Sequence, residues 1–365
     1  MMHNHLKPVN TSLNLQVIIG LILCCLIVLS VQSIAGAKIV FDYNASIYVM
    51  NDNGSGIRRL TGSQFWEGRP HWSPDGSQIA FERNLEKDIQ KYQLFIMNAD
   101  GTDQQQLTHN GDGDRNGDPT WSPDGRYLAF KSNRNSKRSN IFVMELESRA
   151  VKQLTGIEEE SSSTSPDWSP DGKEILYKKH ILRGGGIADT NIWVMSADGT
   201  NQRPLLPDQD PGPQLSFRVY PRWSSDGQRI LFLKSIGGLQ GDFPIKRFVV
   251  MRPNGAKKEI DVNEKMGGEW VGSGLCWMDH GQAFLFSAGL LEVPREKQYH
   301  DIYRYEITTG KLRRLTRHRY HDIRPHWVEG ALAVSPQGKL PTQWGEMKAI
   351  YGIETSAENE KYTSP

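Results

Sequence analysis

Short apolar runs recur along the whole chain, and polar turn residues separate them. The runs are three or four residues long and rich in β-branched and aromatic side chains, as in Ile39–Phe41, Ile79–Phe81, Leu128–Phe130, Leu94–Met97 and Ile192–Met195. Runs of this length and composition are typical of β-strands and are too short for helices. The hydrophobic pattern therefore predicts an all-β protein with no helix of consequence.

A tryptophan-containing segment divides these strands into units of about 50 residues. Residues 69–76 read Arg-Pro-His-Trp-Ser-Pro-Asp-Gly, close copies follow at 118–125, 165–172 and 220–227, and decayed copies follow at 276–281 and 324–330. A repeat of this length is typical of a solenoid or a propeller. The repeated tryptophans are Trp72, Trp121, Trp168, Trp223, Trp277 and Trp327. Their regular placement on a core strand indicates packing between neighbouring units.

Each unit contains four strands joined by recognisable turns. Ser-Pro-Asp-Gly joins the first strand to the second, because proline presets φ and glycine accepts the left-handed conformation. Asp-Gly or Asn-Gly joins the third strand to the fourth, as in hairpins. Six such units predict a six-bladed β-propeller of four-stranded antiparallel blades. The chain begins with second, third and fourth strands at 39–41, 47–50 and 57–61 and ends with a first strand around Trp327, so we expect both termini to close one blade.

The repeated Pro-x-Trp-Ser-Pro-Asp-Gly, followed by an apolar strand and then Ile-aromatic-Val-Met-x-Ala-Asp-Gly and Leu-Thr, resembles the WD40-like repeats of TolB-type propellers. The resemblance covers residues 38–335. It implies a bacterial extracytoplasmic propeller that acts in protein–protein contact. The sequence departs from TolB itself because no separate N-terminal α/β domain precedes the first strand. Related propellers precede serine hydrolase domains, but this chain contains no G-x-S-x-G motif.

The N-terminal segment has the features of a secretory signal peptide. Lys7 precedes an apolar run from Leu15 to Val31, and Ala35-Gly36-Ala37 fits a cleavage site. We expect cleavage after Ala37 and a periplasmic or secreted protein with no membrane span, while an uncleaved anchor is the alternative. We assign residues 336–365 to a partly disordered C-terminal extension.

Charge and cysteine content narrow the classes of partner. Without residues 1–37 the chain has 42 basic and 42 acidic residues, and a neutral chain argues against nucleic-acid binding. Only Cys276 remains after cleavage, so no intramolecular disulfide can form. We expect a monomer.

Variation in loop length indicates which face carries function. The connections from second to third strands and from fourth to first strands vary in length, while the other turns are short and uniform. Function on a rigid scaffold is usually found in its variable loops, so we place the binding site at this loop face and at the mouth of the central channel. Glu67, Arg218 and Asp322 share the position three residues before the repeat proline and predict a charged channel entrance. The other binding-face candidates are Trp66, Trp270, His318 and His321.

Two patterns raise the possibility of a metal. Asp112, Asp114, Asn116 and Asp118 match the start of a calcium loop, although position twelve is Pro123 instead of glutamate. Histidines 109, 180, 300, 318 and 321 fall in loop-face segments, but no H-x-H or H-E-x-x-H spacing occurs. Calcium is thus the one candidate cofactor.

Two functional hypotheses follow. The first is a non-catalytic scaffold that binds a protein or peptide partner of the cell envelope through its loop face. The second is a metal-assisted hydrolase or polysaccharide lyase with its site in the central channel. Convergence of three or more His, Asp or Glu side chains would favour the enzyme.

Overall fold

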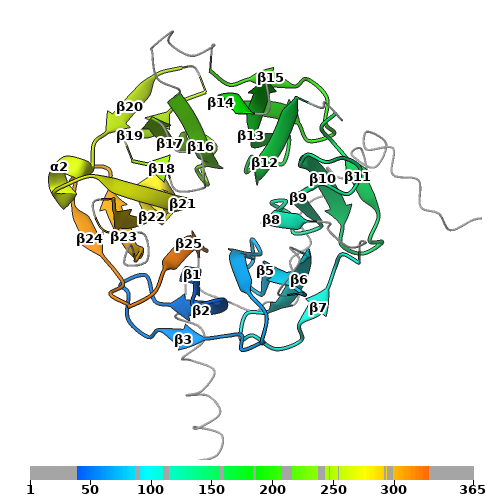
Figure 1. Ribbon diagram of the computed structural model, residues 1–365, viewed down its shortest axis with the longest axis horizontal. Coiled ribbons are helices and arrows are strands. Elements are labelled where there is room, and N and C mark those ends of the chain that lie inside the picture. Colours follow the sequence, from blue (N-terminus) through cyan, green and yellow to red (C-terminus); the bar gives the residue numbers. More distant parts are fainter. Residues whose placement is uncertain are drawn as a thin grey trace, which may run out of the picture.

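The fold is a ring of six antiparallel blades of four main strands each, seen in a computed structural model (Figure 1). A parallel pairing between Thr190 and Phe217 joins the fourth and fifth blades into one eight-stranded sheet. The structure describes residues 39–86, 91–109, 115–156, 160–183, 186–206, 216–236, 243–245, 247–253, 255–291, 293 and 299–328. The predicted signal peptide and the predicted C-terminal extension lie outside these ranges, and so do Asp112 and Asp114. No helix among the described residues is long and apolar enough to cross a membrane.

Blade 1 combines strands from both ends of the described chain, and blades 2 and 3 each use four consecutive strands. Blade 1 contains β25 (Asp322–Trp327), β1 (Ile39–Tyr43), β2 (Ser46–Met50) and β3 (Arg58–Arg59). Blade 2 contains β4 (Glu67–Trp72), β5 (Gln78–Asn84), β6 (Tyr92–Asn98) and β7 (Gln105–Gln106). Blade 3 contains β8 (Asn116–Trp121), β9 (Tyr127–Ser132), β10 (Asn140–Glu145) and β11 (Val151–Gln153).

The other three blades follow in order. Blade 4 contains β12 (Ser161–Trp168), β13 (Glu174–Arg183), β14 (Gly186–Ser196) and β15 (Arg203–Pro204). Blade 5 contains β16 (Ser216–Trp223), β17 (Ile230–Ile236), β19 (Arg247–Met251) and β20 (Lys257–Ile260). Blade 6 contains β21 (Trp270–Met278), β22 (Ala283–Leu290), β23 (Asp301–Glu306) and β24 (Leu312–Arg314), and β18 (Phe243–Pro244) adds to its inner edge. Two short helical turns, α2 (Asn263–Met266) and η1 (Asp279–Gly281), complete the described elements.

The two ends of the described chain meet in blade 1. β25 pairs antiparallel with β1, with Ile39 opposite Trp327 and Tyr43 opposite Asp322. Figure 1 shows β25 beside β1 within blade 1, and it shows blade 6 as the neighbour of blade 1 in the ring. A hydrophobic cluster joins the two blades, since Ile39 and Phe41 of β1 pack with Met278 and Leu285 of blade 6. This junction is called the closing seam below.

The described core consists of six clusters, one at each junction between blades. Trp72, for example, is 2% exposed and joins Val49 of blade 1 to Phe81 of blade 2. Each of the six repeated tryptophans belongs to one cluster or packs against it. The prediction that these indoles pack between blades is confirmed. Apolar burial at each junction replaces the single core of an ordinary domain.

The serine and aspartate of the repeat have the same hydrogen-bonding role in the four well-preserved turns, which begin at Ser73, Ser122, Ser169 and Ser224. In the first copy, Asp75 Oδ1 accepts the Ser73 hydroxyl at 2.6 Å and the Ser77 N–H at 3.0 Å. The Ser73 hydroxyl oxygen also accepts the Gln78 N–H at 2.9 Å. Gly76 has φ +69°, a conformation that costs glycine least. The side chains thus satisfy backbone donors that a tight turn leaves without strand partners.

The Leu-Thr pair completes the outer strand by the same principle. Thr155 Oγ1 accepts the N–H of Ile141, the residue near the start of the third strand, at 2.9 Å. Thr61, Thr108 and Thr316 make the equivalent bond in their blades. Each threonine therefore extends a short ladder by one bond.

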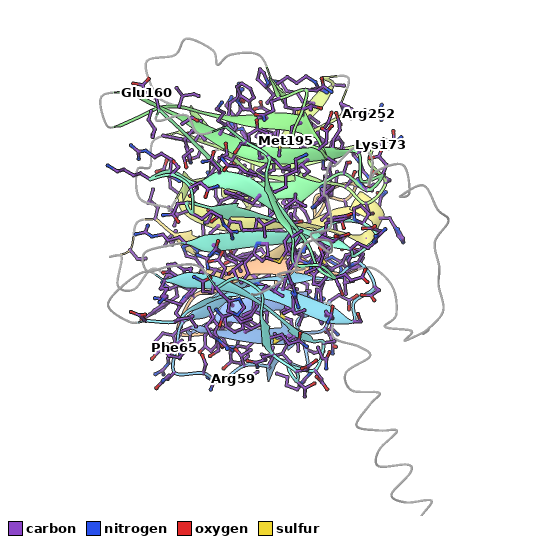
Figure 2. All side chains as sticks on the ribbon, turned by 90° about the vertical axis from the view of Figure 1, so that its right-hand side faces the viewer. Arg59, Phe65, Glu160, Lys173, Met195 and Arg252 are labelled. Atoms are coloured by element: carbon purple, nitrogen blue, oxygen red, sulfur yellow. The ribbon has the colours of Figure 1, made fainter. Side chains whose placement is uncertain are left out.

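The two faces of the ring differ as the loop lengths predict. Figure 2 shows the ring edge-on, with Glu160 and Phe65, from connections that lead into inner strands, towards one face. Lys173 and Arg252, which lie in tight turns, are at the opposite face. The first is the loop face and the second is called the turn face.

Candidate functional site

The inner strand of every blade contains a bulge at the same position. The strand register shifts there, and the residue three before the repeated tryptophan adopts a left-handed backbone, as at Arg69 with φ +51°. In five blades this residue precedes the repeat proline, whereas in blade 6 Gly274 precedes Leu275. Proline disfavours this conformation in its predecessor, and each non-glycine case costs about 1–3 kcal/mol. The six equivalent residues, called the bulge ring, are Arg69, Asp118, Ser165, Tyr220, Gly274 and Arg324.

Charged members of the bulge ring are bonded between blades. The Arg69 guanidinium lies 2.9 Å from Glu82 and 3.0 Å from Asp118 of the next blade. Lys131 lies 3.1 Å from the other oxygen of Asp118. Burial alone would raise the pKa of Asp118, but Lys131 and Arg69 hold it well below its usual range. Asp118 is therefore an ionised bridge between two cations.

A second ion pair involves Arg324, the bulge-ring residue at the closing seam. Arg324 donates to the buried carboxylate of Asp42 at 2.7 Å. Burial raises the pKa of Asp42 to about 6, although Arg324 and Arg69 act in the opposite direction.

The Arg324 guanidinium also lies 5.8 Å from the ring centre of Trp66. Trp66, predicted as a contact residue, is half-buried beside Tyr92, so it borders the loop-face mouth of the channel.

A cluster of aromatic and imidazole rings lies at the loop face over the closing seam. Tyr43 is 4.8 Å from His318 and 6.0 Å from Tyr320, measured between ring centres. Tyr299 is 6.4 Å from Tyr320 and 6.2 Å from His321. Tyr299 is 41% exposed and Tyr320 is 51% exposed. These five residues are called the seam patch, and they include the predicted His318 and His321.

Buried polar residues contact the two histidines of the seam patch. Asp322 is fully buried and accepts a hydrogen bond from His318 Nδ1 at 2.9 Å. Burial raises the pKa of Asp322 to about 6, although the bonds from His318 and Thr316 lower it. His300 is 3% exposed, its ring lies 5.1 Å from that of His321, and burial lowers its pKa to about 3. Neutral His300 thus anchors the patch to the core.

The remaining binding-face candidates are more widely spaced. Glu67 is fully buried and bonds to Arg83 at 2.7 Å, so neither Glu67 nor Asp322 presents its charge to solvent. The expected ring of exposed charges is wrong at these two positions, because each carboxylate is used inside its blade. Arg218 donates to Asn191 at 2.8 Å. Trp270 packs edge-on against Tyr303 within blade 6.

The described members of the calcium pattern already have protein partners. Asn116 Oδ1 accepts from Arg134 at 3.0 Å, and its amide donates to Gln93 at 3.1 Å. Asp118 bridges Arg69 and Lys131, as described above. Within the described ranges, no three His, Cys, Asp or Glu side chains are grouped closely enough to hold a metal.

A cavity of about 280 Å³ lies where the inner strands reach the turn face, and it is called the turn-end cavity. Indoles and turn prolines form its walls, among them Trp168, Trp223 and Pro170. The residue preceding each repeated tryptophan also lines it. These residues are His71, Thr120, Asp167, Arg222, Cys276 and His326. The loop-length argument did not find this cavity, although the polar residues before the tryptophans were its signal in the sequence.

Comparison with known proteins agrees with this architecture. The family model described as the TolB beta propeller domain matches residues 113–247. TolB from Acinetobacter baumannii has the same fold with a TM-score of 0.58 at 18% identity, over 80% of this chain and 66% of that chain. A putative TolB from Agrobacterium tumefaciens gives 0.51 at 20% identity, over 62% of this chain and 77% of that chain. The chain has the β-propeller fold of these TolB structures.

Other similar structures show how widely this fold is used. Hydrazine synthase from Kuenenia stuttgartiensis matches the TolB-like propeller with a TM-score of 0.59 at 14% identity, over 80% of this chain and 47% of that chain. No curated protein matches the sequence. The TolB-like propeller spans 66% of the length of the Acinetobacter TolB. At these identities the likeness establishes the fold, and function has to be argued from the site.

Proposed function

We propose that this protein is a non-catalytic extracytoplasmic scaffold that binds a protein or peptide partner of the cell envelope through the seam patch and the adjoining channel mouth. The observation that carries the proposal is the pair of exposed rings of Tyr299 and Tyr320 beside His318 and His321. Tyrosine combines a large apolar surface with a polar hydroxyl and is enriched among residues that dominate binding energy.

The position of the patch supports binding more strongly than its composition alone. The other large hydrophobic residues exposed in the described part of the chain are Ile57 and Val151. Ile57 lies in the third-to-fourth connection of blade 1, and Val151 is the first residue of the fourth strand of blade 3. Single exposed apolar residues of this kind need no functional explanation. Tyr299 and Tyr320 instead come from different connections and meet across the closing seam.

The channel mouth extends this surface. Trp66 stands beside Arg324 on the loop side of the bulge ring, and Asp42 fixes the guanidinium. Tryptophan and arginine, like tyrosine, are frequent anchors in interfaces. The predicted signal peptide and the TolB resemblance support an extracytoplasmic location for such a partner.

The proposal is tested by quantitative capture from an envelope extract. The bait is the mature chain, which is the protein from Lys38 onwards after the predicted cleavage. It is compared with a Tyr299→Ala/Tyr320→Ala variant. An Ile57→Ala/Val151→Ala control removes exposed apolar surface from the other face. We expect the seam variant to recover at least about 10-fold less of any specific partner, since each such anchor contributes at least about 2 kcal/mol, or about 30-fold in affinity. The unfolding midpoint of both variants verifies folding. Equal recovery by both variants would refute the seam patch as the binding surface.

A further inference from the structure

The turn-end cavity contains an arginine with an unused hydrogen-bonding edge. Arg222 donates through Nε to the Leu275 carbonyl at 3.0 Å and through Nη1 to the Pro221 carbonyl at 3.0 Å. These bonds fix the guanidinium plane. Within the described ranges, Nη2 makes no hydrogen bond to protein. The nearest carboxylate oxygen, of Asp167, is 3.9 Å from Nη1, which is too far for a hydrogen bond.

Two closely packed histidines, with their ring planes tilted by 35°, add a neutral donor to the same cavity. The rings of His71 and His326 lie 3.4 Å apart between centres. His326 Nδ1 accepts the Trp72 N–H at 3.2 Å, so the proton of this ring is on Nε2. Burial and the nearby positive charge of Arg222 lower the pKa of His71 to about 3 and the pKa of His326 well below its usual range. Both rings are therefore uncharged at neutral pH.

The other lining groups set the charge of the cavity. The Cys276 thiol donates to the Trp277 carbonyl and accepts the Trp327 N–H, and burial raises its pKa to about 12. The cavity thus contains an un-ionised thiol instead of a nucleophile. Asp167 accepts the Trp223 N–H at 2.7 Å and forms an ion pair with Nη1 of Arg222 at 3.9 Å. This acid compensates part of the arginine charge and repels further negative charge, so the cavity favours a ligand with one carboxylate over a dianion.

We propose that the turn-end cavity binds a monocarboxylate with an apolar or aromatic body. The carboxylate lies against Nη2 of Arg222 and Nε2–H of His326, and the body lies between the indoles. Arginine recognises planar carboxylates through its fixed fork of donors, and these charge-assisted bonds are stronger than neutral ones. The volume of about 280 Å³ is near the lower end for small-molecule pockets, about 300 Å³, so it suits a small acid or the last residue of a peptide.

This site is separate from the seam patch. Asp322, below the patch, begins β25 at the loop face, whereas His326 is near the other end of the same strand. Substitutions in one site therefore leave the other intact, and the two proposals can fail independently.

Calorimetric titration of the mature chain tests the proposal with N-acetylphenylalanine, its carboxamide and inorganic phosphate as probes. We expect saturable binding of the acid and at least 10-fold weaker binding of both the amide and phosphate, since one charge-assisted contact is lost or mismatched. A peptide ending in a free phenylalanine, compared with its C-terminally amidated form, distinguishes a chain end from a free acid as the source. Tighter binding of that peptide than of the small acid would indicate a chain end.

Variants connect the binding to named atoms. Arg222→Met is expected to weaken binding of the acid about 10-fold or more, and Arg222→Lys, which keeps the charge but loses the fork, is expected to weaken it less. Arg203→Gln, in an exposed ion pair on an outer strand, is the matched control and leaves binding unchanged. Unfolding midpoints and tryptophan fluorescence verify that each variant folds. No saturable binding of the acid, equal binding of acid and amide, tighter binding of phosphate, or an unaffected Arg222→Lys variant would overturn the proposal.

Discussion

Asp118 provides the sharpest test of how the inner strands are held in their strained conformation. Its carboxylate lies 3.0 Å from Arg69 and 3.1 Å from Lys131, and the positive charge of Lys178 also acts on it. The Asp118→Asn substitution removes this negative charge. Arg69 then keeps its ion pair with Glu82, while Lys131 loses its ion pair with Asp118. Removing one partner from a fully buried charge network costs about 3–5 kcal/mol. The side chains of Arg69, Asp118 and Lys131 are partly exposed, so we expect a smaller loss of about 2–3 kcal/mol. The loss corresponds to a melting temperature lower by about 4–6 °C, at about 2 °C per kcal/mol for a chain of this size.

Thermal and denaturant unfolding at pH 7.5 measure this effect against a matched control. Glu174→Gln makes the same chemical change in the exposed ion pair with Arg203, and we expect it to alter stability by less than about 1 kcal/mol. Because the folded pKa of Asp118 is depressed, its stabilisation is present above the unfolded value of about 4 and is lost as the pH falls below that value. The difference between wild type and Asp118→Asn should therefore shrink in acid. Equal losses for the two variants at pH 7.5, or a difference that grows in acid, would refute the reasoning.

Three further predictions follow from the described contacts. Thr155→Val leaves the Ile141 N–H without its acceptor and should cost about 1–3 kcal/mol in denaturant unfolding, whereas the exposed Thr200→Val should cost much less; similar losses would contradict the role assigned to Leu-Thr. Gly274→Ala would place a Cβ 2.7 Å from Arg324 Cα at φ +73°, so we expect a loss of at least about 1–3 kcal/mol, and wild-type stability would show that the bulge is not constrained. Because Asp118 already bridges two cations, we expect millimolar calcium to leave the melting temperature unchanged in calorimetry, whereas a rise would support the calcium loop.

The architecture could be predicted because its determinants are local and repeated. Each Ser-Pro-Asp-Gly satisfies its own turn, as the bonds of Ser73 and Asp75 show, and each tryptophan packs at one junction. Short apolar runs, turn residues and the tryptophan repeat therefore predicted the blades without knowledge of distant contacts. His318 and His321 were predicted at the loop face because connection lengths vary there, and their rings lie in the seam patch.

The charges could not be placed from the sequence because their partners lie in other strands. Glu67 and Asp322 read as surface acids, but Arg83 and His318 hold them inside their blades. The left-handed backbone at Arg69 was also unforeseen, since a residue before proline is normally extended. The exposed pair of Tyr299 and Tyr320 depends on two separate connections that meet only when the ring closes.

Site-specific photo-crosslinking tests the proposed binding surface most directly. A photoreactive phenylalanine analogue replaces Tyr320 in one variant and Ile57 in another, and both proteins are irradiated in the native cell envelope. The account predicts a discrete protein or peptide adduct from position 320 that is not formed from position 57. Adducts from position 57 alone, or the same adducts from both positions, would contradict it.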